Sequence, residues 1–358
     1  MKTLAVVANV SSTPVNDRLL RALHREPVDC TPVWFMRQAG RSLPEYRALK
    51  EGRSLLDICR QPELCAEVTA QPVARLGVDA AVLYADIVLP MIGVGIDLDI
   101  KEGVGPVIAQ PMRSSEDALR LRPLQPGDLD FVSEGIKCTL QRLANAVPLI
   151  GFAAAPFTLA SYLIEGRPSR DFQKTKRLMY NAPDVWQDIM SRLVDITSGY
   201  LSLQVEAGVH ALQLFDSWAG VLSPDDYSRY VQPYSTQVLD SPALRAVPII
   251  HFGTGTAGLL EAMRDAGGST IGVDWRVSLD AAWTRIGYDR GIQGNMDPLI
   301  AQAPWKVVKR EASAILKRAA HRPGHIFNLG HGVHPDTDPE QLARLVDFVH
   351  DASSRDAS

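Results

Sequence analysis

The sequence predicts an α/β protein that folds as a single (β/α)8 barrel. Eight short apolar runs recur along the chain, and such runs are typical of strands buried on both faces. Most of them are followed by a turn and then by an amphipathic stretch, as in residues 185–204 and 304–320. The chain has 358 residues without a low-complexity linker, a length that one TIM barrel with insertions can fill. We therefore expect one domain over residues 1–358.

The eight runs give the expected strands in chain order. They are Val33–Met36, Ala80–Tyr84, Leu149–Ala153, Ala211–Phe215, Pro248–Phe252, Thr270–Val273, Gly291–Gln293 and Ile326–Leu329. Residues 93–130, ahead of the third run, are rich in Gly, Pro and Asp and predict an irregular or hairpin excursion. Residues 1–16 and 352–358 are expected to be loose ends.

Composition limits the classes of function. The net charge of −4 and the pI of about 6.1 argue against a nucleic-acid binder, which normally presents a basic domain. The 4 Cys form no disulfide framework, and we find neither a secretory leader nor a stretch long enough to span a membrane. The sequence therefore predicts a soluble cytoplasmic protein with reduced thiols.

A parallel barrel places its active site at the carboxyl ends of the strands. The residues just after each run should therefore face a substrate, and they form a polar ring without an obvious Ser-His-Asp order or metal signature. This ring comprises Arg37, Asp86, Asp216 with Ser217, Gly253, Asp274, Asn295 and His331.

Arg37 and Arg41 lie four residues apart in a Gly-containing turn. Each guanidinium can hold a carboxylate through two parallel hydrogen bonds, which a lysine cannot match. The alternative is that both are solvated loop residues or salt-bridge partners for helix carboxylates. The segment Ser42–Glu45 has the pattern of a capping box, with Pro44 in the first helical turn.

Asp86, Tyr162 and Ser217 are further candidates. A carboxylate at Asp86, at the apolar end of a strand, needs a polar partner. A cluster of N–H donors on a ligand would supply one. The hydroxyls of Tyr162 and Ser217 can orient a carboxylate without adding charge. Taken singly, each of the three can also be a structural or capping residue.

His331 lies between two glycines, so a bulky ligand can approach it. It could donate a hydrogen bond to a ligand carboxylate or transfer protons near neutral pH. His321, His325 and His334 also invite a metal interpretation, but their spacing fits no standard ligand set and no Cys lies nearby. We expect no metal.

Taken together, these motifs resemble one family. The segment Val33–Arg41 is similar to the N-terminal signature of the uroporphyrinogen decarboxylases, and the likeness extends from about Arg18 to Val349. The later blocks that resemble the family are Gly151–Gly166, Gln213–Gly220, Gln293–Pro298 and Asn328–Gly332.

The resemblance implies a barrel enzyme, usually a homodimer, that uses no metal or organic cofactor. It implies removal of the four acetate carboxylates of uroporphyrinogen III to give coproporphyrinogen III. The positions that match the family's active site are Arg37, Arg41, Asp86, Tyr162, Ser217 and His331. Three positions depart from the pattern: Lys50 stands where many members have Arg, Ser42 replaces a usual Tyr, and Ala154 a usual Gly.

The implied chemistry assigns Asp86 as the acceptor for the pyrrole N–H groups. Arg37 supplies a proton, binds the departing carboxylate or relays protons through bound water, and the sequence leaves these three roles open. One rival is a zinc-dependent methyltransferase of the same barrel superfamily, although no His lies two residues before a Cys here. Another is a catalytically silent porphyrinogen-binding protein.

Overall fold

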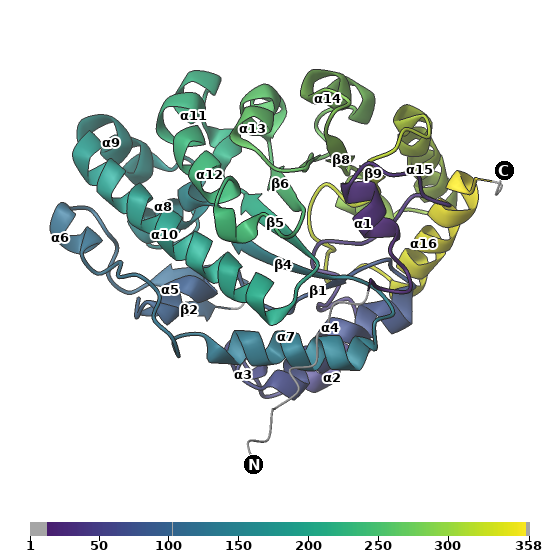
Figure 1. Cartoon of the computed structure of the whole chain (residues 1–358), viewed down its shortest axis with the longest axis horizontal. Coiled ribbons are helices and arrows are strands. Elements are labelled where there is room, and N and C mark those ends of the chain that lie inside the picture. The colour runs from purple at the N-terminus through teal and green to yellow at the C-terminus, as the bar shows by residue number, and fades with distance from the viewer. Residues whose placement is uncertain (1–12, 102, 356–358) are drawn as a thin grey trace, which may run out of the picture.

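The computed structural model describes residues 13–101 and 103–355. Seven strands form one parallel sheet in the order β1-β4-β5-β6-β7-β8-β9, and β2 pairs with β3 in a separate antiparallel hairpin. The sheet curls through the middle of the molecule with helices outside it (Figure 1). The strands are β1 (Ala81–Val82), β2 (Leu98–Lys101), β3 (Gly105–Ile108), β4 (Leu149–Ala154), β5 (Ala211–Asp216), β6 (Ile249–Gly253), β7 (Thr270–Gly272), β8 (Gly291–Gln293) and β9 (His325–Ile326).

The helices connect successive strands and cover the outer surface of the sheet. The α-helices are α1 (Arg18–Leu23), α2 (Pro44–Lys50), α3 (Leu55–Cys59), α4 (Pro62–Leu76), α5 (Leu89–Gly93), α6 (Ser115–Ala118), α7 (Asp130–Leu143), α8 (Pro156–Glu165), α9 (Gln173–Asn181), α10 (Pro183–Ala207), α11 (Pro224–Tyr230), α12 (Gln232–Leu239), α13 (Leu260–Ala266), α14 (Leu279–Ile286), α15 (Trp305–Ala319) and α16 (Pro339–Ser353). Short 3-10 turns are η1 (Ala219–Val221), η2 (Pro242–Leu244), η3 (Thr256–Gly258) and η4 (Pro298–Gln302).

The first expected strand, Val33–Met36, is not among the seven strands of the sheet. Within the described residues this run makes only an isolated bridge, from Val33 to Phe327. The physical reason is that the backbone N–H groups of Phe35 and Met36 donate to side chains and not to a neighbouring strand. Gln38 Oε1 accepts from the N–H of Phe35 at 3.0 Å, and Asn328 Oδ1 accepts from that of Met36 at 3.2 Å. The observed sheet is therefore an open, curled seven-stranded one.

The backbone of residues 32–34 nevertheless bonds to both edges of this sheet. The N–H of Phe327, just after β9, donates to the carbonyl of Pro32 at 2.9 Å. On the other side, the N–H of Asp79 donates to the carbonyl of Val33 at 2.8 Å. Asp79 lies two residues before β1, so the segment bridges β9 and the chain entering β1.

The carboxylate of Asp79 is fully buried and joins distant parts of the chain. It accepts from the N–H of Val33 at 2.7 Å, from Asn16 Nδ2 at 2.8 Å and from Arg18 at 3.2 Å. His350 Nε2, on α16, lies 2.7 Å from it. Burial alone would raise the pKa of Asp79, but the bonds led by His350 hold it below its usual value. This cluster lies at the amino ends of the strands.

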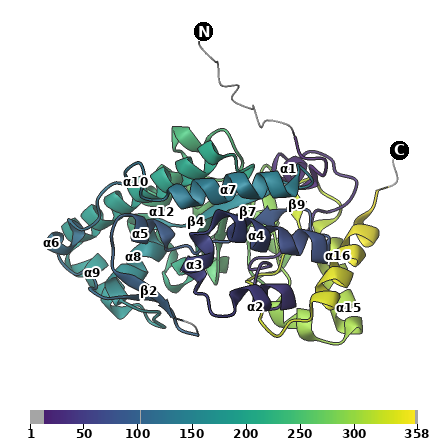
Figure 2. The ribbon, with the colours of Figure 1, turned by 90° about the horizontal axis from the view of Figure 1, so that it is seen from below.

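The expected excursion over residues 93–130 is confirmed as a hairpin. Strands β2 and β3 pair from Leu98 with Ile108 to Lys101 with Gly105. A second group of buried apolar residues, which includes Ile96, Ile108 and Phe157, packs the excursion against α8 and α10. In Figure 2 the hairpin and α6 lie at the opposite end of the molecule from α15 and α16.

The sequence predicted loose ends over residues 1–16 and 352–358. Of these, residues 1–12 and 356–358 lie outside the described residues. The remainder is held by backbone bonds. The N–H groups of Val15 and Asn16 donate to the carbonyls of Asn145 and Ala146, and that of Arg355 donates to the carbonyl of Asp29. Helix α16 continues to Ser353.

His325, the first residue of β9, gives a pH-dependent contribution to stability. Its Nε2 lies 3.2 Å from the carbonyl of Gly294, while Nδ1 has no partner among the described residues. Burial lowers its pKa from 6.5 to about 4, so the folded protein binds fewer protons there than the unfolded chain. The free energy of unfolding should therefore fall by up to about 3 kcal/mol from this residue as pH drops from 6.5 to 4.

Urea unfolding between pH 7 and pH 4 tests this expectation. His325→Gln keeps a neutral donor for Gly294 and should flatten the fall in stability across this window. His24→Gln, at an exposed histidine, is the control and should leave the slope as in the wild type. An equal slope in His325→Gln and the wild type would contradict the assignment.

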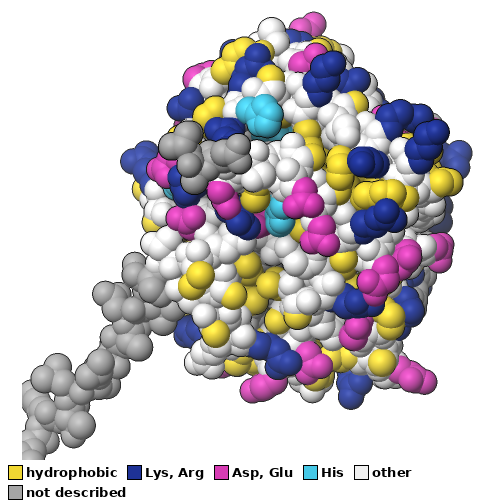
Figure 3. Space-filling view, turned by 90° about the vertical axis from the view of Figure 1, so that its right-hand side faces the viewer, with side chains coloured by type: hydrophobic (Ala, Val, Ile, Leu, Met, Phe, Trp, Pro, Cys, Tyr) yellow, Lys and Arg dark blue, Asp and Glu magenta, His cyan; other side chains and the backbone are white. Residues whose placement is uncertain are grey.

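The surface shows no large field of one sign on the face that carries α15 and α16. Lys and Arg side chains alternate there with Asp and Glu (Figure 3). Over residues 13–101 and 103–355, no helix combines the length and apolar character needed to cross a bilayer.

Candidate active site

The predicted site residues gather where the parallel strands end. Asp86 follows β1, Ser217 follows β5 and His331 follows β9. Tyr162 lies on α8, the helix directly after β4, and Arg37 follows the segment that bridges β9 and the chain before β1. We call this end of the sheet the mouth.

Arg37 sits in a turn whose shape is imposed by its buried neighbour. Gln38 donates from Nε2 to the carbonyl of Ala80 at 2.8 Å and accepts from the N–H of Phe35, which fixes the turn against β1. Arg37 itself adopts a left-handed backbone with φ of 62° and is exposed. Its side chain crosses Gly332, where an added Cβ would lie 2.4 Å from Arg37 Cδ. A glycine at 332 is therefore what allows Arg37 to reach across to the β9 side.

Asp86 presents a half-buried carboxylate at the end of β1. Oδ1 accepts from the N–H of Val88 at 3.0 Å, but Val88 is itself the N-cap of α5 and no side chain caps that helix. No described residue donates to Oδ2. Burial raises the pKa of Asp86, and the Val88 bond and the charge of Arg37 oppose this only in part. Further N–H donors would stabilise this carboxylate.

Tyr162 faces the same region as a neutral hydroxyl. Burial, together with the charge of Asp86, raises its pKa to about 12. Its ring packs edge-on against Trp218, with the centroids 5.9 Å apart. Trp218 follows Ser217, whose carbonyl accepts from Thr254 Oγ1 at 2.6 Å. Ser217 is thus linked to Tyr162 through its neighbour and to the loop after β6.

His331 is a neutral imidazole in the absence of ligand. Burial, together with the positive charge of Arg37, lowers its pKa from 6.5 to about 4. The charges of Arg276 and Asp274 also act on it, in opposite directions. Of the two roles expected from the sequence, hydrogen-bond donation to a carboxylate suits this state better than proton transfer near neutral pH.

One residue connects the ends of three different strands. The charge of Arg37 lowers the pKa of Asp86, of Tyr162 and of His331. Because such effects weaken with distance, these three side chains lie on the same side of the molecule as Arg37. We call Arg37, Asp86, Tyr162 and His331 the Arg37 group.

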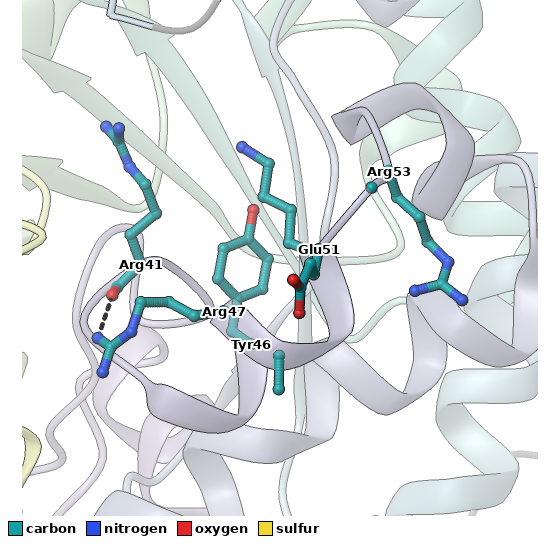
Figure 4. Close-up of a pocket in the computed structure, with 8 residues that line it drawn as sticks. Arg41, Tyr46, Arg47, Glu51 and Arg53 are labelled. Atoms are coloured by element: carbon teal, nitrogen blue, oxygen red, sulfur yellow. Dashed lines mark hydrogen bonds between the residues drawn. The ribbon is translucent and has the colours of Figure 1, made fainter.

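Arg41 lines a hollow of about 640 Å³ beside α2 (Figure 4). Its guanidinium and the Tyr46 hydroxyl point to the same side, while Arg47 donates to the Arg41 carbonyl at 2.8 Å. The Tyr46 hydroxyl is 2.7 Å from that of Tyr84, two residues before Asp86. The hollow therefore adjoins the β1 side of the mouth. Its lining residues are Arg41, Tyr46, Arg47, Ala48, Lys50, Glu51, Gly52 and Arg53.

The capping box expected at Ser42–Glu45 is not formed. Leu43 is the N-cap of α2 and Pro44 its first residue, as expected for the proline, but no side chain caps the helix. Ser42 is buried, and its hydroxyl has no partner among the described residues. Since the chain enters α2 one residue later than the pattern suggests, the Ser42 hydroxyl cannot reach the free N–H groups.

Arg276, two residues after Asp274 at the end of β7, was not among the predicted site residues. Its guanidinium pairs with Asp274 Oδ2 and lies 4.2 Å from the ring centre of Trp275. Asp274 Oδ2 also accepts from the N–H of Gly255 at 2.6 Å. Gly330 packs against Asp274 and Trp275, so the β7 loop lies beside His331. The signal available in the sequence was its place directly after a strand.

No group of three or more His, Cys, Asp or Glu side chains in the described part of the chain is arranged to hold a metal ion. His325, one of the four clustered histidines of the sequence, is instead packed in the core between Trp283 and Phe327.

The chain resembles proteins of one family along almost its whole length. The family model described as uroporphyrinogen decarboxylase (URO-D) matches residues 14–352. A uroporphyrinogen decarboxylase of Salinispora tropica is 52% identical over 342 residues, which are 96% of this chain and 92% of the relative. One of Streptomyces griseus is 54% identical over 336 residues, or 94% and 92% of the two chains.

Among solved structures, a methyltransferase from Methanosarcina mazei superposes with a TM-score of 0.77 at 20% identity, covering 95% of this chain and 99% of the other. At that identity the likeness concerns the fold alone. The family match over residues 14–352 and the relatives at 52% and 54% identity show more than the fold. The chain belongs to the uroporphyrinogen decarboxylase family.

Proposed function

We propose that this chain is a carboxy-lyase that converts uroporphyrinogen III to coproporphyrinogen III and CO2, with the Arg37 group as its reacting centre. The observation that carries the assignment of the site is that Asp86 follows β1, Tyr162 lies on the helix directly after β4, and the Arg37 side chain crosses Gly332, next to His331. Family membership supplies the substrate.

Asp86 binds the macrocycle. A porphyrinogen is non-aromatic and can dome, so its four pyrrole N–H groups converge on one acceptor. Burial makes the Asp86 carboxylate unfavourable in the free protein, and Oδ2 receives no bond from the described residues. The pyrrole donors replace the missing solvation. Its negative charge also stabilises the cationic ring that forms during reaction.

The substrate is its own electron acceptor. A proton added to the pyrrole ring carbon beside an acetate arm gives an iminium-like cation. When the C–C bond to the carboxylate breaks, CO2 leaves and its bonding electrons neutralise that cation. A proton then adds to the exocyclic carbon to form the methyl group, and loss of the ring proton restores the pyrrole. The net change is one proton taken up for each CO2 released, so no cofactor is required by this chemistry.

Arg37 holds the carboxylate of the reacting arm, and its two parallel N–H donors suit that geometry. A guanidinium is a poor acid, so protons reach the ring through water bound beside it. Tyr162, Ser217 and His331 orient the neighbouring carboxylates as neutral donors, and Arg41 binds those on the β1 side.

Replacing Arg37 by lysine should lower kcat roughly 100-fold, more than it raises KM. A lysine keeps the charge but cannot make two parallel hydrogen bonds, so the reacting arm loses its alignment. Initial rates with uroporphyrinogen III under nitrogen give both constants. Arg310→Lys, at an exposed arginine on the outer helix α15, is the control. An unchanged kcat in Arg37→Lys would exclude Arg37 from the chemical step.

Further properties of fold, assembly and location belong to the same proposal. The Pro32–Trp34 segment acts as an eighth strand and closes the sheet into a single barrel domain over residues 1–358. The protein forms a homodimer in the cytoplasm and binds neither nucleic acid nor membrane. The bonds of Pro32 and Val33 to both sheet edges support closure, and sedimentation velocity tests the dimer.

The function is tested by anaerobic incubation with uroporphyrinogen III, followed by oxidation and chromatography. Porphyrins with seven, six, five and four carboxylates should appear in succession, with one CO2 released at each step. A protein of correct mass and fold that releases no CO2 would refute the assignment.

A further inference from the structure

We propose that Arg276 binds a carboxylate on the β7 side of the mouth and thereby sets the affinity for the macrocycle. The inference rests on the proposed function for the identity of the substrate. It does not follow from the sequence motifs, which leave this residue out.

The first support is the distribution of charge around the mouth. The loops after β5, β6, β7, β8 and β9 are residues 217–223, 254–259, 273–278, 294–304 and 327–338, all of them described. Arg276 is the only Lys or Arg in these five loops. Arg37 and Arg41 both lie before β1 in the chain. Two cations from neighbouring helices touch these loops, but Lys176 donates to the carbonyl of Val221, and Arg285 donates to that of Ala257 and pairs with Glu261. Arg276 is therefore the cation that these loops themselves offer to a substrate with carboxylates all round its rim.

The second support is how the guanidinium is held. Asp274 binds Arg276 twice, through the backbone N–H at 3.0 Å and through the side chain. Asp274 is itself fixed by Gly255, and the Arg276 guanidinium stacks on Trp275. One of the five N–H donors of the guanidinium is used by Asp274, which leaves the rest for a ligand. A tethered arginine loses less conformational freedom when it binds a carboxylate.

The third support is position. The side chain of Arg276 is 52% exposed, so a ligand can reach it. Gly330 packs directly on Asp274 and Trp275 and thus sets the β7 loop beside His331. The charge of Arg276 acts on His331, which in turn belongs to the Arg37 group. Arg276 and His331 can therefore contact neighbouring carboxylates of one bound ring.

Arg276→Gln tests the proposal with two readouts. The Kd for uroporphyrin, an octacarboxylate, is measured by quenching of tryptophan fluorescence and should rise about tenfold. KM for uroporphyrinogen III should rise by a similar factor, while kcat stays within about twofold. The losses should shrink at high salt, because a half-exposed charge is screened. In NMR titrations, the pKa of His331 should rise in the variant.

Two further variants complete the experiment. Arg276→Lys keeps the charge but cannot donate two parallel hydrogen bonds to a carboxylate. Its Kd should therefore lie between those of the wild type and Arg276→Gln. Arg310→Gln removes an exposed arginine that pairs with Glu311 on the outer helix α15, and it should bind as the wild type does.

The outcomes are separable. An unchanged Kd and KM in Arg276→Gln would overturn the inference, and so would a fall in kcat at constant KM. If the wild type released no CO2 but bound uroporphyrin, the proposed function would fail, and the Kd comparison would still decide the role of Arg276. A wild type that did not bind the octacarboxylate would overturn both.

Discussion

Replacing Asp86 by alanine should lower kcat by roughly 1,000-fold or more and weaken binding of the macrocycle. The variant removes the acceptor on which the pyrrole N–H groups converge and the charge that balances the cationic ring. Burial already raises the pKa of this carboxyl group, so a neutral side chain is tolerated in the free protein and the loss falls mainly on the complex. Rates under nitrogen and binding of uroporphyrin measure the two effects.

Two matched variants separate charge from shape. Asp86→Asn keeps an oxygen for the N–H of Val88, which Asp86 Oδ1 binds at 3.0 Å, and therefore preserves the start of α5. It should be nearly as inactive as Asp86→Ala, because it lacks the charge. Asp86→Glu should retain some activity. Turnover of Asp86→Ala at the wild-type rate would rule out the central carboxylate.

Replacing Asp79 by alanine should destabilise the fold by about 3–5 kcal/mol, because it leaves buried donors without their acceptor. Val33, Asn16, Arg18 and His350 would all lose a partner. The pKa of Asp79 lies below the 3.8 of an unfolded chain. Its contribution is therefore present above pH 3.8 and is lost as pH falls through the folded pKa.

Urea unfolding at pH 7 measures this loss. Asp265→Ala is the matched control, because Asp265 pairs with Arg264 at the surface, is 53% exposed and should cost less than about 1 kcal/mol. For folded Asp79→Ala at low temperature, kcat and KM should equal those of the wild type, since Asp79 lies at the amino ends of the strands. A loss of stability no larger than in Asp265→Ala would contradict the role of the cluster.

The interior of the sheet could be predicted from local sequence, because burial on both faces requires unbroken apolar runs. Runs such as Leu149–Ala153 and Ala211–Phe215 became β4 and β5 with a change of one residue at the end. The first run, Val33–Met36, is equally apolar, but Gln38 and Asn328 bind its N–H groups. Such competition by side chains distant in sequence is not visible in periodicity.

The site residues also fall into those that local sequence predicts and those that depend on contacts distant in the chain. Arg37 and Asp86 could be found because each follows an apolar run, and strand ends converge in a parallel sheet. Arg276 also follows a strand, but its role could not be predicted from the sequence. That role depends on contacts with Asp274 and Trp275, on which Gly330 packs. The pattern at Ser42 failed because one residue of offset moved the hydroxyl into the core.

The Asp79 cluster also constrains when the molecule can finish assembling. Its bond to His350 spans 271 positions, and the N–H of Thr31 donates to Ser353 Oγ across 322. During synthesis these two bonds can therefore form only after the end of α16 has left the ribosome. Contacts of such separation slow folding and prolong exposure of unpaired edges. A nascent chain stalled before residue 339, where α16 begins, should remain sensitive to protease and depend on chaperones.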